Sequence, residues 1–234
     1  MSVYTDAIKI QNLCFHWRME DAPTLDLPEL HIKHGESVFI KGASGSGKST
    51  LLSLIGGVLL PQSGTVSVLG QQLNKLSSAK RDSFRAEHIG FIFQMFNLIP
   101  YLPVIDNVLL PCRFSQRRKH NIEKRGVSVE EEAVRLLEHL DLSTDMLQRP
   151  VTELSVGQQQ RVAAARALIG SPELVIADEP TSALDSDRRS DFLQLLLKEC
   201  LEQETTLVFV SHDSALEPQF DRSIHLVDIN RAVN

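Results

Sequence analysis

The chain has 234 residues, of which 42% are hydrophobic, and a formal net charge of −6. This length and composition predict one folded domain with a substantial core and a smaller attached subdomain, and they disfavour a disordered chain. The acidic balance disfavours a nucleic-acid binder, because phosphate contacts need clustered Lys and Arg. No apolar run approaches the ~20 residues of a membrane helix, and Met1–Gln11 lacks the apolar stretch of a signal peptide, so we expect a cytosolic protein.

The first part of the chain predicts a small antiparallel sheet. Residues 7–13 alternate between apolar and polar side chains, and a similar pattern begins at 30–32. Trp17, the only tryptophan, lies between the two segments. Two functions are open for its ring, which either packs at the edge of the sheet or stacks on a nucleotide base. Cys14 lies in the same region, and with Cys112 and Cys200 it is expected to be reduced, because the three are odd in number and far apart.

A glycine-rich segment between a predicted buried strand (37–41) and a predicted helix (51–55) indicates a phosphate-binding loop. Glycines let the backbone curl so that successive N–H groups point at an anion, and the following helix adds its unpaired amides and the positive end of its dipole. Lys48 adds a full positive charge. The residues of this loop are Gly42, Ala43, Ser44, Gly45, Ser46, Gly47, Lys48, Ser49 and Thr50.

The middle of the chain predicts a strand at 65–68, a polar helix at 79–88 and a buried strand at 89–93 that ends at Gln94. An irregular loop bracketed by two prolines follows, and helices are expected at 106–110 and 129–140. Between these helices, residues 117–125 form a basic stretch. We expect it to be a solvated loop or a patch near anionic lipid headgroups, and the sequence does not separate the two.

From residue 150 onward, helices alternate with strands that are apolar throughout. The expected elements are helices at 157–169 and 186–201 and strands at 174–177, 205–210 and 224–227. Strands of this kind belong to a parallel sheet that is covered on both faces, so the fold class is α/β. Ligands bind such sheets at the carboxyl ends of the strands.

Polar residues follow three of the predicted strands, and they are candidates to meet the phosphate loop. Asp178 can hold Mg²⁺, and the adjacent Glu179 can orient or deprotonate a water in line with the γ-phosphate. Gln94 can ligate the metal or position the water, and His212 can hydrogen-bond the γ-phosphate. Each residue also has an ordinary structural explanation, namely a helix cap for Asp178, a surface turn for Gln94 and a loop histidine for His212. Their convergence on one sheet edge favours the functional explanation.

The segment Leu154-Ser155-Val156-Gly157-Gln158-Gln159-Gln160-Arg161 resembles the signature motif of ATP-binding-cassette (ABC) ATPases. The 174–178 segment is similar to the Walker B strand of that family, residues 182–185 to its D-loop, and His212 to its switch histidine. The resemblance covers nearly the whole chain in order and spacing. It implies a P-loop NTPase (RecA-like) core, an antiparallel β subdomain, and a helical subdomain inserted at about residues 95–165 of a single domain spanning 1–234.

The resemblance also implies a site that two chains share. Two copies sandwich two ATP molecules with Mg²⁺, and each nucleotide contacts the loop of one chain and the signature of the other. Ser155, Gly157, Gln158 and Asp185 are then binding residues, Ser49, Gln94 and Asp178 are metal ligands, and Lys48, Gln94, Glu179 and His212 are catalytic. Trp17 falls at the position of the adenine-stacking aromatic residue. Val156 departs from the family pattern, which most often has glycine there, so the shared site is expected to be slower or slightly reshaped.

Within the family, segments 93–100, 106–108 and 158–163 most resemble the MacB, LolD and FtsE group of bacterial ATPases. This implies a separate integral membrane permease, peripheral attachment to the cytoplasmic face of the inner membrane, and export or extraction of a periplasmic substrate. We expect the permease to dock near Met95–Val104 through exposed Phe96 and Leu98, although these side chains suit a subdomain core equally well. The alternatives are an FtsE-like signalling ATPase that moves no substrate and a soluble ABC ATPase outside transport.

Overall fold

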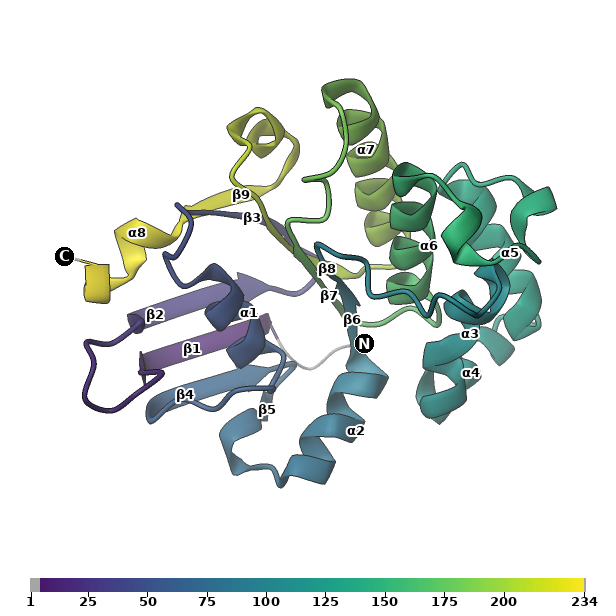
Figure 1. Cartoon of the computed structure of the whole chain (residues 1–234). Coiled ribbons are helices and arrows are strands. Elements are labelled where there is room, and N and C mark those ends of the chain that lie inside the picture. The colour runs from purple at the N-terminus through teal and green to yellow at the C-terminus, as the bar shows by residue number, and fades with distance from the viewer. Residues whose placement is uncertain (1–4, 234) are drawn as a thin grey trace.

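The computed structural model describes residues 5–233, which form two sheets and a layer of helices (Figure 1). The strands are β1 (Asp6–Phe15), β2 (Leu25–Lys33), β3 (Ser37–Lys41), β4 (Ser63–Val68), β5 (Gln71–Gln72), β6 (Ile89–Ile92), β7 (Leu174–Asp178), β8 (Thr206–Val210) and β9 (Arg222–His225). The α-helices are α1 (Lys48–Ile55), α2 (Ser78–His88), α3 (Val104–Phe114), α4 (Gln116–Glu123), α5 (Val129–His139), α6 (Val156–Leu168), α7 (Ser186–Glu202) and α8 (Leu226–Ile229). Within the described range, no helix is both long and apolar enough to cross a membrane.

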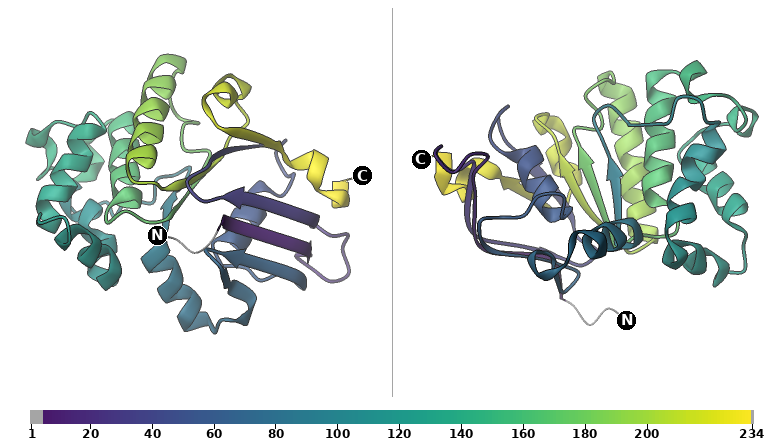
Figure 2. Two further views of the ribbon diagram at one scale, coloured as in Figure 1. Left: turned by 180° about the vertical axis from the view of Figure 1, so that it is seen from behind. Right: turned by 60° about the horizontal axis from the view of Figure 1, so that its bottom comes forward.

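The predicted antiparallel sheet is confirmed and has the strand order β2-β1-β4-β5. Helix α1 contacts both β4 of this sheet and β7 of the second sheet, so it lies between the two sheets (Figures 1 and 2). The sheet brings the loop between β1 and β2 against the phosphate loop. A Cβ atom on Gly47 would approach the Leu25 side chain to 2.8 Å and the Thr24 carbonyl oxygen to 3.3 Å.

The second sheet is parallel throughout, with the order β6-β7-β8-β3-β9. Its register aligns Asp178 of β7 with Val210 of β8, and Val210 with Ile40 of β3. These three residues therefore form one row across the sheet. Because the strands all run the same way, the phosphate loop after β3 and the polar residues after β7 and β8 leave the sheet at the same edge.

Alternate residues of the parallel strands supply two separate hydrophobic cores. In β3, Phe39 belongs to the core that includes residues of helices α3 to α7, whereas Val38 and Ile40 belong to the core that includes α1 and the antiparallel sheet. In β8, Phe209 belongs to the same core as Phe39, and Val210 belongs to the same core as Val38 and Ile40. A strand with both faces buried must be apolar at every position, which is why these strands show no polar alternation in the sequence.

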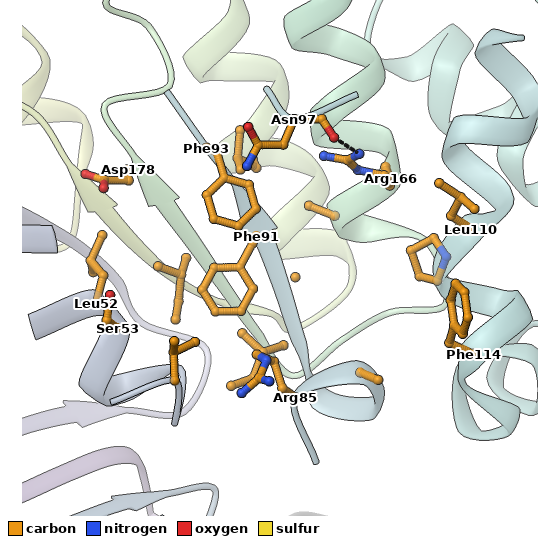
Figure 3. A pocket seen from close by; sticks show the side chains of 18 of the residues that line it. Leu52, Ser53, Arg85, Phe91, Phe93, Asn97, Leu110, Phe114, Arg166 and Asp178 are labelled. Atoms are coloured by element: carbon orange, nitrogen blue, oxygen red, sulfur yellow. Dashed lines mark hydrogen bonds between the residues drawn. The ribbon is translucent and has the colours of Figure 1, made fainter. Parts of the chain in front are cut away.

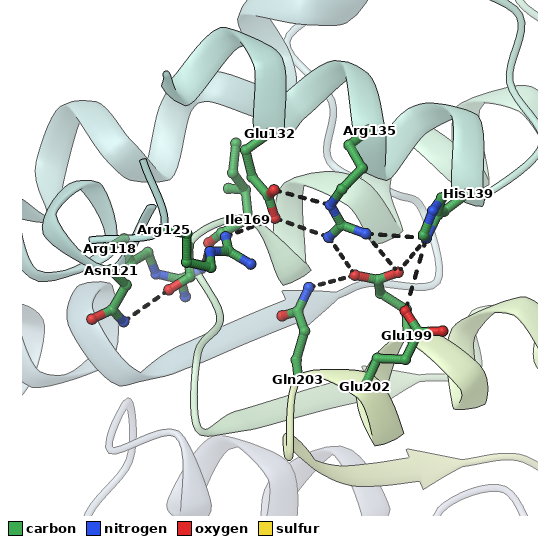
Figure 4. A network of polar contacts seen from close by, with 11 residues as sticks. Arg118, Asn121, Arg125, Glu132, Arg135, His139, Ile169, Glu199, Glu202 and Gln203 are labelled. Atoms are coloured by element: carbon green, nitrogen blue, oxygen red, sulfur yellow. Dashed lines mark hydrogen bonds and ion pairs between the residues drawn. The ribbon is translucent and has the colours of Figure 1, made fainter. Parts of the chain in front are cut away.

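Two predictions for the chain are corrected. The expected strand at 224–227 ends at His225, and α8 begins at Leu226. The basic stretch 117–125 is largely helix α4 and not a loop. Three of its cations have carboxylate partners: Arg117 pairs with Glu173, Lys119 with Glu123, and Arg125 with Glu132, the last of which Figure 4 shows. These pairs reduce the net positive charge that the stretch presents.

Arg118 of the same helix is fully buried and bonds only to main-chain oxygens. Its guanidinium donates to carbonyls of residues 86, 89, 167 and 169 at 2.7–3.1 Å, from the end of α2, the start of β6 and the end of α6. Burial lowers the pKa of Arg118 to about 10, so it stays charged at neutral pH. One side chain thus ties the helical layer to the edge of the parallel sheet.

We expect Arg118→Ala to lower the free energy of unfolding by about 3 kcal/mol or more, since it leaves several buried carbonyls without donors at about 1–3 kcal/mol each. Urea denaturation measures the loss. Arg113→Ala is the matched control, because Arg113 is exposed on α3 and pairs only with Asp106; its cost should stay within about 0.5 kcal/mol. Equal losses in the two variants would contradict the role assigned to Arg118.

Candidate functional site

The phosphate loop has the strand-to-helix setting that its sequence predicts. It leaves β3 at Lys41 and enters α1 at Lys48. Gly45 and Gly47 have φ values of 79° and 98°, in the region that glycine adopts without strain. The ammonium of Lys48 is folded into the loop, where it donates to the carbonyls of Gly42 and Ala43 at 2.8 Å each. The positive charge therefore sits inside the curl of the backbone.

The carboxylates at the end of β7 lie beside this loop, as predicted. The Ser49 hydroxyl donates to Asp178 Oδ2 at 3.0 Å, and Lys48 Nζ lies 3.9 Å from Glu179 Oε1. His212, which follows β8, has its Nδ1 atom 3.3 Å from Glu179 Oε2. Residues separated by more than 120 positions in the sequence thus form one cluster.

Two features of this cluster are energetically unfavourable. Burial raises the pKa of Asp178 above its ordinary value, and the neighbouring Glu179 carboxylate adds to the rise, whereas the Ser49 hydrogen bond and Lys48 oppose it. Glu179 has a φ of 45°, which is uncommon for a residue other than glycine. Its amide donates to the Val210 carbonyl at 2.9 Å, and this bond holds the strained residue against β8. Strained or destabilised groups cluster at functional sites.

The signature residues line a different cavity, of about 320 Å³. Ser155 is the N-cap of α6 and forms a capping box with Gln158, in which Ser155 Oγ accepts from the Gln158 amide and Gln158 Oε1 accepts from the Ser155 amide. Gly157 and Leu184 also line this cavity. Asp185, in the D-loop, caps α7 by accepting from the Arg188 amide. A helix N-terminus that opens into a cavity is suited to an anion.

Two predicted residues stand apart from the cluster. Gln94 follows β6 at the same sheet edge, but its side chain is exposed and forms no hydrogen bond within the described residues. Trp17 is 62% exposed and contacts Phe15 edge to face, with ring centroids 5.4 Å apart. Its open face is available to a ligand. In the predicted docking segment, Phe96 is only 8% exposed and belongs to the core, so the core explanation holds for it.

A groove of about 730 Å³ reaches from the carboxylate cluster to the helical layer (Figure 3). Ser49 and Asp178 lie at one end. Its walls are mainly apolar and come from α1, β6 and α3, and include Leu52, Phe91, Phe93, Leu110, Pro111 and Phe114. Phe114 is 77% exposed. No local sequence pattern marks this groove, because its walls come from elements that do not adjoin in the chain.

Removing the charge of Asp178 should stabilise the nucleotide-free protein. Asp178 has a higher pKa in the folded chain than its ordinary value of 3.8. Between these two pKa values the folded chain binds more protons than the unfolded chain, so the free energy of unfolding falls as pH rises through this window. Asp178→Asn avoids this loss and keeps an acceptor for Ser49. We expect Tm at pH 7 to rise by on the order of 2 °C, and the gain to shrink below pH 3.8. A lower Tm at pH 7 would contradict the conclusion that the buried charge of Asp178 destabilises the fold.

Comparison with known proteins gives a consistent result. Residues 25–182 match the family model described as ABC transporter. The chain is 39% identical over 205 residues to the lipoprotein-releasing system ATP-binding protein LolD of Xanthomonas euvesicatoria, covering 87% of this chain and 80% of LolD. It is 42% identical over 200 residues to the Escherichia coli K12 ABC transporter ATP-binding protein YbbA, covering 86% and 84%.

Among solved structures, the chain is similar to the dimeric post-hydrolysis state of the ATP-binding cassette MJ0796 bound to ADP and Pi, from Methanocaldococcus jannaschii. The TM-score is 0.81 at 39% identity, and the match covers 93% of both chains. The cassette CbiO1 of Clostridium perfringens matches with a TM-score of 0.80 at 26% identity, over 95% of this chain and 85% of CbiO1. The two-sheet arrangement is therefore shared with ATP-binding cassettes.

Proposed function

The chain belongs to the ABC transporter family, and on this premise we propose that it binds ATP with Mg²⁺, dimerises around the nucleotide and powers a separate membrane permease of the MacB/LolD type. The permease holds it at the cytoplasmic face of the bacterial inner membrane, where it supports export or extraction of a periplasmic substrate. One observation carries the proposal: Lys48, Ser49, Asp178 and Glu179 meet at the phosphate loop. Family membership makes the chain an ABC ATPase.

The phosphate loop binds the nucleotide by charge and backbone donors. The Lys48 ammonium, which now contacts two loop carbonyls, is placed to exchange them for phosphate oxygens. The N-terminus of α1 adds its unpaired amides. The exposed ring of Trp17 is proposed to stack on adenine, since the β1–β2 loop ends against Gly47.

The oxygen donors at the loop suit Mg²⁺, which prefers hard oxygen ligands and retains several waters. The Ser49 hydroxyl and an Asp178 carboxylate oxygen already lie 3.0 Å apart, and Asp178 is a partly buried carboxylate whose raised pKa reflects incomplete compensation. These residues would hold the ion, with Gln94 as a further oxygen ligand from β6. The ion, when bound, would supply positive charge to neutralise the phosphates of the nucleotide.

Hydrolysis is assigned to Glu179 and His212. Glu179 lies one residue farther out from the sheet than Asp178, where its carboxylate can orient a water and accept its proton. The contact between His212 Nδ1 and Glu179 Oε2 at 3.3 Å holds the two side chains together. The His212 ring is then placed to contact the γ-phosphate and preserve the attacking geometry.

The signature cavity is proposed to complete the site of a second copy. Ser155 Oγ accepts a hydrogen bond within the capping box, which leaves its hydroxyl proton for a phosphate oxygen. A Cβ atom on Gly157 would meet only the Leu184 side chain, at 3.5 Å, so the space above the helix start is open to a ligand. Gln158 lines the same cavity, and Asp185 directly follows the lining residue Leu184 in the chain. The dimeric MJ0796 cassette with ADP and Pi supports this arrangement.

The groove is proposed as the permease-docking surface, next to the predicted Met95–Val104 segment. Met95 and Tyr101 of that segment are exposed, but the larger apolar surface belongs to the groove walls on β6 and α3. A groove that ends at Ser49 and Asp178 puts the partner close to the chemistry. We propose that residues of about 95–165 form the helical subdomain that carries one wall.

Glu179→Gln should keep ATP binding, lower turnover by about 100-fold or more, and trap a dimer, because the water loses its base while the loop is intact. Lys48→Ala should instead lose nucleotide binding. Steady-state hydrolysis, nucleotide binding and size-exclusion chromatography with ATP measure these effects. Normal hydrolysis by the Glu179 variant, or unchanged ATP affinity of the Lys48 variant, would remove the assigned roles.

Phe114→Asp should abolish co-purification of a membrane partner from solubilised membranes, because it places a charge in the apolar groove. Its ATP binding without the partner should be unchanged. Leu201→Asp is the matched control, since Leu201 is 78% exposed at the end of α7 and does not line the groove. Loss of the partner from both variants, or from neither, would argue against docking in the groove.

A further inference from the structure

The loop that carries Gln94 contains two consecutive residues in a strained conformation. Phe96 and Asn97 have φ values of 58° and 49°. This left-handed region is unfavourable for a residue with a side chain, and asparagine tolerates it better than phenylalanine. The Phe96 amide donates to the Phe93 carbonyl and the Asn97 amide to the Met95 carbonyl, which makes a tight turn. Such a turn persists only where its surroundings hold it.

Arg166 of α6 supplies that restraint. Its Nη1 donates to the Asn97 carbonyl at 2.7 Å and its Nη2 to the Phe96 carbonyl at 2.6 Å (Figure 3). The planar guanidinium offers two donors in a fixed fork, which matches two successive carbonyls; a lysine ammonium does not. Phe96 is also fixed from its other side by packing in the core.

The arginine depends on the loop in return. Burial lowers the pKa of Arg166, and its guanidinium has no ion pair with a carboxylate among the described residues. A partly buried cation without an ion pair relies on its hydrogen bonds, since leaving its buried donors unsatisfied costs more than it would for a neutral group. The two loop carbonyls are the acceptors that Arg166 has among the described residues.

The position of Arg166 joins three parts of the proposed function. It lies in the last turn of α6, and the signature residue Ser155 is the N-cap of the same helix. Together with Asn97 it lines the groove. The next part of the loop has a separate anchor, because the buried Asn107 side chain bonds to the main chain of Ile99 and to the carbonyls of residues 102 and 103. Arg166 therefore acts on the Gln94 side of the loop.

We propose that Arg166 is a positioning residue that fixes the backbone turn behind Gln94 and connects this turn, and the groove beside it, to the signature helix. A partner that displaces the turn from the groove side thereby pulls on α6. The inference rests on the proposed function, in which Gln94 ligates the metal. It adds a residue that touches neither nucleotide nor metal.

A structural test uses hydrogen–deuterium exchange in the protein without nucleotide or metal. Arg166→Gln should speed exchange of the Phe96 and Asn97 amides by about 10-fold or more, because the turn opens locally. The Ile99 amide, which donates to Asn107 Oδ1, should exchange as in the wild type. Arg113→Gln is the control, since Arg113 is exposed on α3 and pairs only with Asp106. Unchanged exchange at Phe96 and Asn97, or faster exchange throughout the chain, would overturn the proposal.

A kinetic test compares the Mg²⁺ concentration for half-maximal ATP hydrolysis in the wild type and four variants. Arg166→Gln should raise this midpoint as Gln94→Ala does, by about 10-fold, as expected when a group that orients a ligand is lost. The midpoint of the double variant should be little higher than that of either single variant. The midpoint of Arg166→Lys should lie between those of Arg166→Gln and the wild type. KM for ATP should change by less than about 2-fold, because the phosphate loop and Trp17 are untouched.

The outcomes separate the inference from the proposed function. If Arg166 only stabilised the fold, its substitution would lower the folded fraction. The rate would then fall at every Mg²⁺ concentration while the midpoint stayed unchanged, and this result would overturn the proposal. If Gln94→Ala moves the midpoint and Arg166→Gln does not, the inference fails while the role of Gln94 stands. If neither variant moves it, both fail.

Discussion

Parallel pairing forces the carboxyl ends of β6, β7, β8 and β3 onto one edge of the sheet, and the proposed chemistry depends on this constraint. The register sets Ile40, Val210 and Asp178 in one row, so the chain segments that follow them start level with one another. A phosphate loop, a carboxylate pair and a histidine then need only one or two further residues to meet. The apolar interior of the strands secures this alignment, because both faces of the sheet are buried.

The edge is built at some cost to the stability of the fold. Asp178 is a carboxylate with a raised pKa, Glu179 has a positive φ, and the Lys48 ammonium contacts the carbonyls of its own loop. The proposed Mg²⁺ would offset the repulsion between the two carboxylates, and the proposed phosphates would give Lys48 an anionic partner. Ligands that bind the folded chain in this way add to its stability.

Arginines that bind carbonyls, more than ion pairs, join the helical layer to strand β6 and to the turn that follows it. Arg118 satisfies carbonyls at the ends of α2 and α6 and at the start of β6, and Arg166 satisfies those of the turn after β6. Helix ends leave such carbonyls unpaired, and a guanidinium can satisfy several at once. The helices thus hold the loop of Gln94 from behind, while the groove leaves it accessible from the front.

The sequence alone determined the phosphate loop, the parallel core and the antiparallel sheet, because local spacing and continuous apolar runs encode them directly, and the resemblance of its signature motif indicated the family. The strand-end residues Asp178, Glu179 and His212 followed from the rule that parallel strands end at one edge. The sequence did not reveal that 117–125 is largely a helix with several paired charges, since the partners Glu132 and Glu173 lie outside this stretch. The only sequence feature that pointed to Arg166 was its position as a charged residue within the alanine-rich predicted helix at 157–169. Only the tertiary structure decided which carbonyls Arg118 and Arg166 contact, and where the groove lies, because these depend on elements that adjoin in space and not in sequence.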